Sequence, residues 1–335
     1  MISSLRRVIP RSVRSLASVS SSNVGPFTVF DRKAKQLQRD RAVAKDGGKS
    51  STTVDYVRDE VADRLLERLE DIKRKFTTIV DLGSGPGHFA RLLGPENATK
   101  CIMIESSGIM FDLFYEYSVL TVPEKTLYRD PDTTFDVTVE RIHADEEELL
   151  QVVEPNSQEA IVSCLSLHWI NDLPGMLVQI NKALRPDGLF LGAMFGGETL
   201  FELRTSLQLA EVDREGGISP HVSPMTDTRD VSNLLGRAGF TLLTVDIDEV
   251  KVAYPSMWEL IDDLRDMGES NAVIGRRHFI HRDTLTAASA IYKELHGNED
   301  GTVPATFQVI FMIGWKPDPS QAKPVDKKST LQNVI

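Results

Sequence analysis

The chain has 335 residues, of which 41% are hydrophobic, and it carries a formal net charge of −11. A chain of this length can bury a full core, and no stretch approaches the roughly 20 consecutive apolar residues of a membrane-spanning helix. The acidic balance argues against nucleic acid as a partner, because affinity for a phosphate backbone comes from lysine and arginine.

The first 22 residues differ in composition from the rest. They contain four arginines, at positions 6, 7, 11 and 14, and eight serines, and the first acidic residue of the chain is Asp31. A basic, serine-rich segment without acids or a continuous apolar centre is typical of a mitochondrial transit peptide. We therefore expect residues 1–22 to be a targeting segment, removed between Ser15 and Asn23.

Residues 23–52 are polar and highly charged and predict an arm or linker. The domain is expected to span 53–317, beginning with a helix whose apolar residues recur at helical spacing from Val57 to Leu69. Strand-like and helix-like segments then alternate, which predicts an α/β fold with a doubly wound, mostly parallel sheet and helices on both faces. The predicted strands are 76–81, 100–104, 136–142, 159–164 and 188–194, and the predicted helices are 87–93, 108–118, 146–152, 174–184 and 199–213.

Two further β-rich segments, 241–254 and 306–316, would bring the sheet to seven strands. Between them the sequence predicts two amphipathic helices, within about 256–297. Ser256 and Glu259 form a capping box at the start of the first. We expect these helices to form a cap over the carboxyl edge of the sheet, followed by a flexible tail at 318–335.

The stretch IVDLGSGPGHFARLL (79–93) is the strongest local motif. Glycines at 83, 85 and 87 permit a sharp turn and a close approach of the backbone to a ligand. A dinucleotide turn would place its third glycine at position 88, which is His88 here. Asp81 ends the strand, where its charge would oppose a pyrophosphate but suits an ammonium group. The turn therefore favours S-adenosylmethionine over a dinucleotide.

Two later acids support this ligand. Glu105 ends the second strand about 20 residues beyond the turn, where doubly wound nucleoside-binding folds place a carboxylate on the ribose hydroxyls. Asp145 follows the third strand, where it can accept from the adenine amino group. Considered individually, Glu105 could equally be a solvent-exposed residue at a strand end, and Asp145 could equally be a helix N-cap. Together with Asp81 they would surround one crevice.

Several long stretches resemble the mitochondrial complex I assembly factor 5 family, which has a class I methyltransferase fold and is related to malonyl-carrier-protein methyltransferases. The resemblance covers roughly Phe30 to Lys316 and is weakest over 106–142. The stretches are ADEE (144–147), SCLSLHWINDLPG (163–175), LRPDGLFLGAMFGGETLFELR (184–204), LQLAEVDREGGISPHVSP (207–224), LLGRAGFTLLTVDIDE (234–249), DDLRDMGESNAV (262–273) and EDGTVPATFQVIFMIGWK (299–316).

The resemblance implies a protein of the mitochondrial matrix, peripheral on the inner membrane, that binds S-adenosylmethionine during assembly of NADH:ubiquinone oxidoreductase. Its partners would be an iron–sulfur subunit, of which it would hydroxylate an arginine, and other assembly factors. The expected cofactor-binding residues are Asp81, Gly83, Gly85, Gly87, Glu105, Asp145 and Leu165.

Catalytic residues are harder to assign. His168, after the fourth strand, is the best-placed general base, although packing of a His–Trp pair is the stronger interpretation. Glu198 follows the fifth strand and could pair with a substrate guanidinium, or simply be an exposed acid at a helix start.

Hydroxylation requires activated oxygen, and the familiar iron site is two histidines and a carboxylate. His143 and Asp145 have a suitable local spacing, with His168, His221, His278 and His281 available as a third ligand. We predict no metal site, because Asp145 has a cofactor role and the fold lacks the β-rich architecture usual for this triad. Methyl transfer to a protein or small carboxylate, and a non-catalytic assembly chaperone that docks through the cap helices, stay open as alternatives.

Overall fold

The computed structural model describes residues 28–107, 134–277 and 279–321. Its centre is a seven-stranded sheet with the strand order β3-β2-β1-β4-β5-β7-β6. Strands β1 to β5 run parallel to their neighbours, whereas β7 is antiparallel to both β5 and β6. The α/β prediction is therefore confirmed. The strands are β1 (Phe76–Leu82), β2 (Ala98–Glu105), β3 (Thr138–His143), β4 (Gln158–Cys164), β5 (Leu184–Phe195), β6 (Thr241–Tyr254) and β7 (Val303–Trp315).

Helices cover both faces of the sheet, because its central strands are apolar on both sides. Ile79 of β1 belongs to a core cluster shared with α3, α7, α9 and α10, and the next residue, Val80, belongs to a cluster shared with α6 and α8. The helices are α1 (Arg32–Ala44), α2 (Lys49–Thr53), α3 (Tyr56–Glu70), α5 (Leu149–Val152), α6 (Leu173–Ala183), α7 (Phe201–Glu215), α8 (Thr228–Arg237), α9 (Met257–Asp266) and α10 (Arg282–His296).

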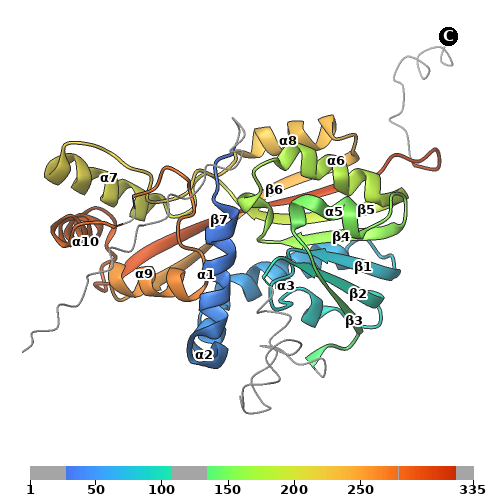
Figure 1. The fold of residues 1–335 in the computed structure, drawn as a ribbon, viewed down its shortest axis with the longest axis horizontal. Helices are drawn as coiled ribbons and strands as arrows, with labels where there is room; N and C mark the ends of the chain where they lie inside the picture. Colours follow the sequence, from blue (N-terminus) through green and yellow to red (C-terminus); the bar gives the residue numbers. More distant parts are fainter. Residues whose placement is uncertain (1–27, 108–133, 278, 322–335) are drawn as a thin grey trace, which may run out of the picture.

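The two helices predicted within about 256–297 are present as α9 and α10. These helices gather with α7 at one side of the molecule, and α1 runs between them and strands β1 to β4 (Figure 1). Ser256 is the N-cap of α9, as predicted, and its hydroxyl accepts from the backbone N–H of Trp258 at 3.1 Å. Within the part of the chain that the structure describes, no helix is long and apolar enough to cross a membrane.

Within the segment predicted as a polar arm (23–52), residues 32–52 are helical, so the prediction is wrong for those residues. Asp31 begins α1 by accepting from the N–H of Ala34 at 2.9 Å. The helix turns two basic residues, Lys35 and Arg39, into the protein, where both are buried. A helix that buries charge rather than an apolar stripe does not produce the periodic hydrophobic pattern by which helices are predicted.

The prediction of a helix at 87–93 is also wrong. There the chain forms successive turns and a short 3₁₀ segment, η2 (Ala90–Leu92). Gly87 has a φ of +98°, which helical residues do not adopt, and Gly94 follows too soon for a regular helix to form between the two. No regular helix therefore follows the glycine turn in this described segment.

The remaining helix predictions agree more closely with the structure. Residues 146–152 form a 3₁₀ turn, η4 (Glu146–Glu148), that leads into α5. Helices α6 and α7 lie within two residues of their predicted bounds at each end. Helix α8 was not predicted. The helix predicted at 108–118 and the end of the tail, 322–335, lie outside the described residues.

Candidate functional site

The glycine turn lies between the carboxyl ends of β1 and β2. Gly83, Gly85 and Gly87 all have positive φ, at +69°, +55° and +98°. The N–H groups of Gly83 and Ser84 donate to the carbonyl oxygen of Ile104 at 2.8 and 3.1 Å. These bonds hold the turn against the end of β2, so its shape depends on the sheet as well as on glycine.

The three glycines serve different purposes. A Cβ at Gly83 would lie 2.1 Å from Oγ of Ser166, and one at Gly87 would lie 2.9 Å from Cε of Met103. Close packing therefore requires glycine at both positions. A Cβ at Gly85 would meet nothing within 4 Å, so this residue faces open space. Gly85 is the position at which a ligand can approach the backbone closely.

Asp81 is fully buried at the end of β1. Neither of its carboxylate oxygens has a hydrogen-bond partner among the described residues. Burial, and secondarily the charge of Glu105, raises the pKa of Asp81 to about 8. A buried carboxylate without a partner is costly unless a cation completes it. The site thus fits the ammonium group of S-adenosylmethionine.

Glu105 is fully buried and ends β2. One carboxylate oxygen accepts from the N–H of Gly85 at 2.9 Å. The other accepts from the N–H of Ser107 at 2.9 Å and from the guanidinium of Arg39 at 3.1 Å. The predicted proximity of Glu105 to the glycine turn is therefore real, and an arginine from α1 already occupies one of its oxygens.

Asp145 lies at the next strand end, and its side chain is 42% exposed. It caps the η4 turn by accepting from the N–H of Glu147 at 3.0 Å. It also accepts from the guanidinium of Arg32 at 2.6 Å. The N-cap interpretation of Asp145 is therefore correct, and its carboxylate is also paired with an arginine of α1.

Leu165 follows β4 and has a φ of +54°, which is uncommon for a residue with a branched side chain. Its N–H donates to the carbonyl oxygen of Ala193 at 2.9 Å, which holds the strained conformation in place. Leu165 lines a small cavity of about 20 Å³ together with Glu105, the glycine turn, Arg39 and Arg58. Of the seven predicted cofactor residues, Asp81, Gly87 and Asp145 do not line this cavity.

Sequence reasoning missed the most highly charged part of the site. Glu146 is fully buried and pairs with Arg32 and, at 3.2 Å, with Arg39. Burial alone would raise the pKa of Glu146, but the charges of the two arginines outweigh it and lower the pKa to about 2. Within the acidic run DEEE nothing local distinguishes Glu146 from its neighbours. The spacing of Arg32, Lys35 and Arg39 on one helical face was a usable signal.

His168 is buried, and its ring centroid lies 5.3 Å from that of Trp169 and 4.8 Å from that of Phe195. Its Nε2 lies 3.8 Å from a carboxylate oxygen of Glu269, too far for a hydrogen bond. Burial lowers the pKa of His168, and Glu269 acts in the opposite direction. The ring contacts agree with the packing interpretation, but neither ring nitrogen of His168 has a hydrogen-bond partner among the described residues.

Glu198, the other catalytic candidate, is exposed in the turn after β5, and its backbone N–H donates to the side chain of Gln308. It is not among the residues that line the described cavities.

His278, one of the histidines considered as a metal ligand, lies outside the described residues. Within the described ranges, no group of three or more His, Cys, Asp or Glu side chains is arranged to hold a metal ion.

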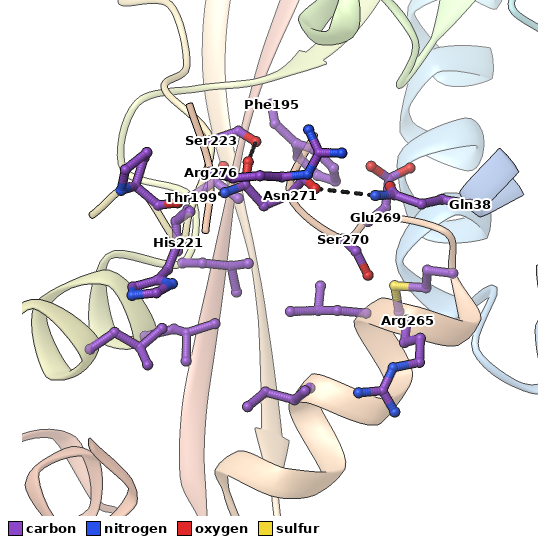
Figure 2. Close-up of a pocket in the computed structure, with 18 of the residues that line it drawn as sticks. Gln38, Phe195, Thr199, His221, Ser223, Arg265, Glu269, Ser270, Asn271 and Arg276 are labelled. Atoms are coloured by element: carbon purple, nitrogen blue, oxygen red, sulfur yellow. Dashed lines mark hydrogen bonds between the residues drawn. The ribbon is translucent and has the colours of Figure 1, made fainter. Parts of the chain in front are cut away.

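A second, much larger cavity of about 630 Å³ adjoins the small one, and Arg58 lines both. Its walls come from α1, the end of β5, α7, α9 and the loops around residues 220–225 and 267–271. Figure 2 shows Gln38 and Ser270 on one side of this space and His221 on the other. The volume lies in the range of small-molecule and side-chain pockets. It is the natural candidate for a substrate site.

Comparisons with known proteins agree with this geometry. Residues 54–245 match the family described as Methyltransferase domain. "Arginine-hydroxylase NDUFAF5, mitochondrial" from Danio rerio is 47% identical over 324 residues, which cover 95% of this chain and 94% of that protein. The human protein of the same name is 45% identical over 309 residues, covering 92% and 83%. The chain belongs to the NDUFAF5 arginine-hydroxylase family.

A more distant relative is "Malonyl-[acyl-carrier protein] O-methyltransferase" from Laribacter hongkongensis, which is 29% identical over 280 residues, covering 82% of this chain and 87% of that protein. The resemblance drawn from the sequence motifs is thus confirmed, as are the methyltransferase fold class and membership of a family of enzymes. The match to a methyltransferase domain also confirms S-adenosylmethionine as the cofactor. The individual cofactor and catalytic residues in this NDUFAF5 family member stay predictions.

Proposed function

We propose that this protein binds S-adenosylmethionine and hydroxylates an arginine of an iron–sulfur subunit during assembly of mitochondrial complex I. The observation that carries the proposal is the 47% identity to an arginine-hydroxylase NDUFAF5 over nearly the whole of both chains. The mitochondrial names of the relatives support a mitochondrial location. Attachment to the matrix face of the inner membrane and contact with other assembly factors belong to the same proposal.

The cofactor is proposed to lie across the carboxyl ends of β1, β2 and β4. Asp81 would take its ammonium group, Gly85 would allow its close approach, and Glu105 would accept from the ribose hydroxyls. Gly83 and Gly87 shape the turn, Asp145 would accept from the adenine amino group, and Leu165 would line the pocket.

The substrate arginine is proposed to enter the larger cavity. Phe195 and Thr199, at and beyond the end of β5, line it, and so does Glu269. Glu269 already accepts from Arg58 at 2.7 Å and from the indole N–H of Trp169 at 2.8 Å. The cavity wall therefore has a buried carboxylate that is suited to guanidinium groups. A direct role for Glu198 would require its exposed side chain to be covered by the substrate protein.

Methyl transfer is the second candidate function. The match to a methyltransferase domain and the relationship to malonyl-carrier-protein methyltransferases favour it. When bound, S-adenosylmethionine supplies an already activated methyl group, so the protein need only orient a nucleophile and exclude water. The two reactions leave different products, which makes them separable.

The decisive experiment incubates the purified protein with the substrate subunit, S-adenosylmethionine, isotopically labelled dioxygen and a two-electron reductant, which is needed to reduce the second oxygen atom of dioxygen to water. Mass spectrometry of the arginine-bearing peptide follows. A gain of one oxygen atom supports the proposal, and incorporation of the label identifies dioxygen as its source. A gain of one methylene unit would establish methyl transfer instead, and an unchanged peptide in the presence of bound cofactor would support a chaperone role.

Two matched variants test the position of the cofactor. Gly85→Leu and Gly216→Leu both place a side chain at a positive φ, +55° and +68°, where nothing lies within 4 Å. Each therefore introduces similar backbone strain, on the order of 1–2 kcal/mol. We expect only Gly85→Leu to abolish binding of S-adenosylhomocysteine, measured by calorimetry. Normal binding by Gly85→Leu would show that the cofactor lies elsewhere.

A further inference from the structure

Helix α1 lies over the cofactor residues and supplies counter-ions to them. The guanidinium of Arg39 lies between Glu105 and Glu146, at 3.1 and 3.2 Å. Arg39 is 6% exposed, and both carboxylates are fully buried. Glu105 is the residue proposed for the ribose hydroxyls. The partner that it has in this conformation is thus an arginine of the same chain.

The second acid assigned to the nucleoside is engaged in the same way. Arg32, two turns earlier on α1, donates to Asp145 at 2.6 Å and also pairs with Glu146. The cavity left beside the glycine turn is about 20 Å³. Pockets for ligands of the size of a nucleoside derivative are typically about 300 Å³ or more. Space for the cofactor therefore requires Arg39 to move.

The same helix is also a wall of the larger cavity. Ala34 and Gln38 line that cavity. The buried ammonium of Lys35 donates to the carbonyl oxygens of Gly268 and Ser270 at 3.0 and 2.8 Å. Gln38 donates to the carbonyl oxygen of Asn271 at 3.1 Å, a contact visible in Figure 2. A movement of α1 therefore changes both cavities.

We propose that α1 is a gate on the cofactor site, in which Arg39 and Arg32 compete with the nucleoside of S-adenosylmethionine for Glu105 and Asp145. The cofactor binds when α1 releases these carboxylates, and the release reshapes the wall formed by residues 268–271. Cofactor binding therefore precedes formation of the substrate site. This inference rests on the proposed cofactor position and is independent of whether the reaction is hydroxylation or methyl transfer.

The gate has a measurable consequence. If only the open form binds, the apparent dissociation constant is the intrinsic constant divided by the open fraction. Arg39→Gln removes the charge that holds α1 on Glu105 and Glu146 and frees an acceptor for the ribose. We expect this variant to bind S-adenosylhomocysteine about three- to tenfold more tightly than the wild type, chiefly through faster association. A residue that merely helped to hold the cofactor would have the opposite effect.

The test measures affinity by calorimetry and association by stopped-flow fluorescence, on the full-length protein. Arg32→Gln, at the start of α1, serves as a second variant should Arg39→Gln fail to fold, and thermal unfolding reports on folding. Lys33→Gln is the matched control, because Lys33 is exposed on the same helix and forms no ion pair with any of the residues that the structure describes. It should bind as the wild type does.

Tighter and faster binding by Arg39→Gln, or by Arg32→Gln if Arg39→Gln does not fold, supports the gate. Unchanged or weaker binding by a folded Arg39→Gln protein, or by Arg32→Gln if the first does not fold, overturns it while leaving the cofactor site intact. Absence of binding in the wild type and in both variants would refute the cofactor assignment itself, and with it the gate. Binding by the variants alone would be the strongest support.

Discussion

Asp81 lowers the stability of the folded protein and at the same time provides a carboxylate for the proposed cofactor site. Its carboxyl is buried without a partner, and its pKa is raised to about 8. An aspartate in an unfolded chain has a pKa of about 3.9. Between these values the folded protein binds the extra proton, so the contribution of Asp81 to stability becomes more unfavourable as pH rises from about 4 to about 8.

We expect Asp81→Asn to be more stable than the wild type at pH 7, by about 1 kcal/mol or more, or roughly 2 °C in Tm. The same change should weaken binding of S-adenosylhomocysteine about 10- to 100-fold, because a hydrogen bond between charged groups is lost. At pH 7 the wild type should release nearly one proton on binding, since the ligand's ammonium favours the ionised carboxylate. Calorimetry in buffers of different ionisation enthalpy measures this release.

Asp213→Asn is the control for this prediction, because Asp213 is exposed on α7 and lies away from both cavities. It should change neither stability nor binding. A wild-type protein that took up no proton and released none would contradict the role assigned to Asp81, as would an Asp81→Asn protein of lower Tm.

Which site residues could be predicted depends on where their partners lie in the chain. Asp81, Glu105 and Asp145 end successive strands, and a parallel sheet brings such ends together whatever the details of packing. Arg39 and Glu146 could not be identified as a pair, because their contact joins positions 107 residues apart and follows from how α1 packs. Position at a strand end is readable from sequence, whereas a long-range ion pair is not.

At the scale of elements, helix α9 could be predicted from the sequence, whereas helix α1 could not. Helix α9 has an N-cap serine and buries Met257, Leu260 and Leu264 on one face, so its pattern predicted it. Helix α1 buries Lys35 and Arg39 together with two small or branched apolar residues near its end. Its stability comes from ion pairs and carbonyl contacts that only the folded protein supplies. Hydrophobic periodicity therefore could not reveal it.

Because α9 forms part of the large cavity, its cap should matter for the substrate site. Ser256→Ala removes the acceptor for the N–H of Trp258 and is expected to destabilise the protein by about 1 kcal/mol. Amide hydrogen exchange in α9 should become faster, and cofactor binding should not change. Ser256→Asn, which retains a capping side chain, should restore slow exchange. Equal exchange in all three proteins would show that the cap contributes little.

At the scale of the whole molecule, residues 1–22 and the folded part of the chain have opposite charge character. The first 30 residues contain four arginines and no acid, so the remaining residues carry a net charge of −15, from 34 basic and 49 acidic residues. A basic segment ahead of an acidic body fits removal after import.

We therefore expect residues 1–30 to direct a fused fluorescent protein to mitochondria. Replacing Arg6, Arg7, Arg11 and Arg14 with glutamine should leave the fusion in the cytosol, as seen by microscopy. N-terminal sequencing of the mature protein should place its first residue between Ser15 and Asn23. Mitochondrial delivery of the arginine-free fusion would contradict the targeting role.

The position of β7 has a consequence for how the chain is made and moved. Strand β7 (Val303–Trp315) is inserted between β5 and β6, although it is the last strand in the sequence. A chain that emerges N-terminus first, from a ribosome or through a translocation pore, cannot close its sheet until about nine-tenths of its length is available. The sheet is therefore completed only near the end of synthesis or translocation. Until then the incompletely folded chain can pass through a narrow pore.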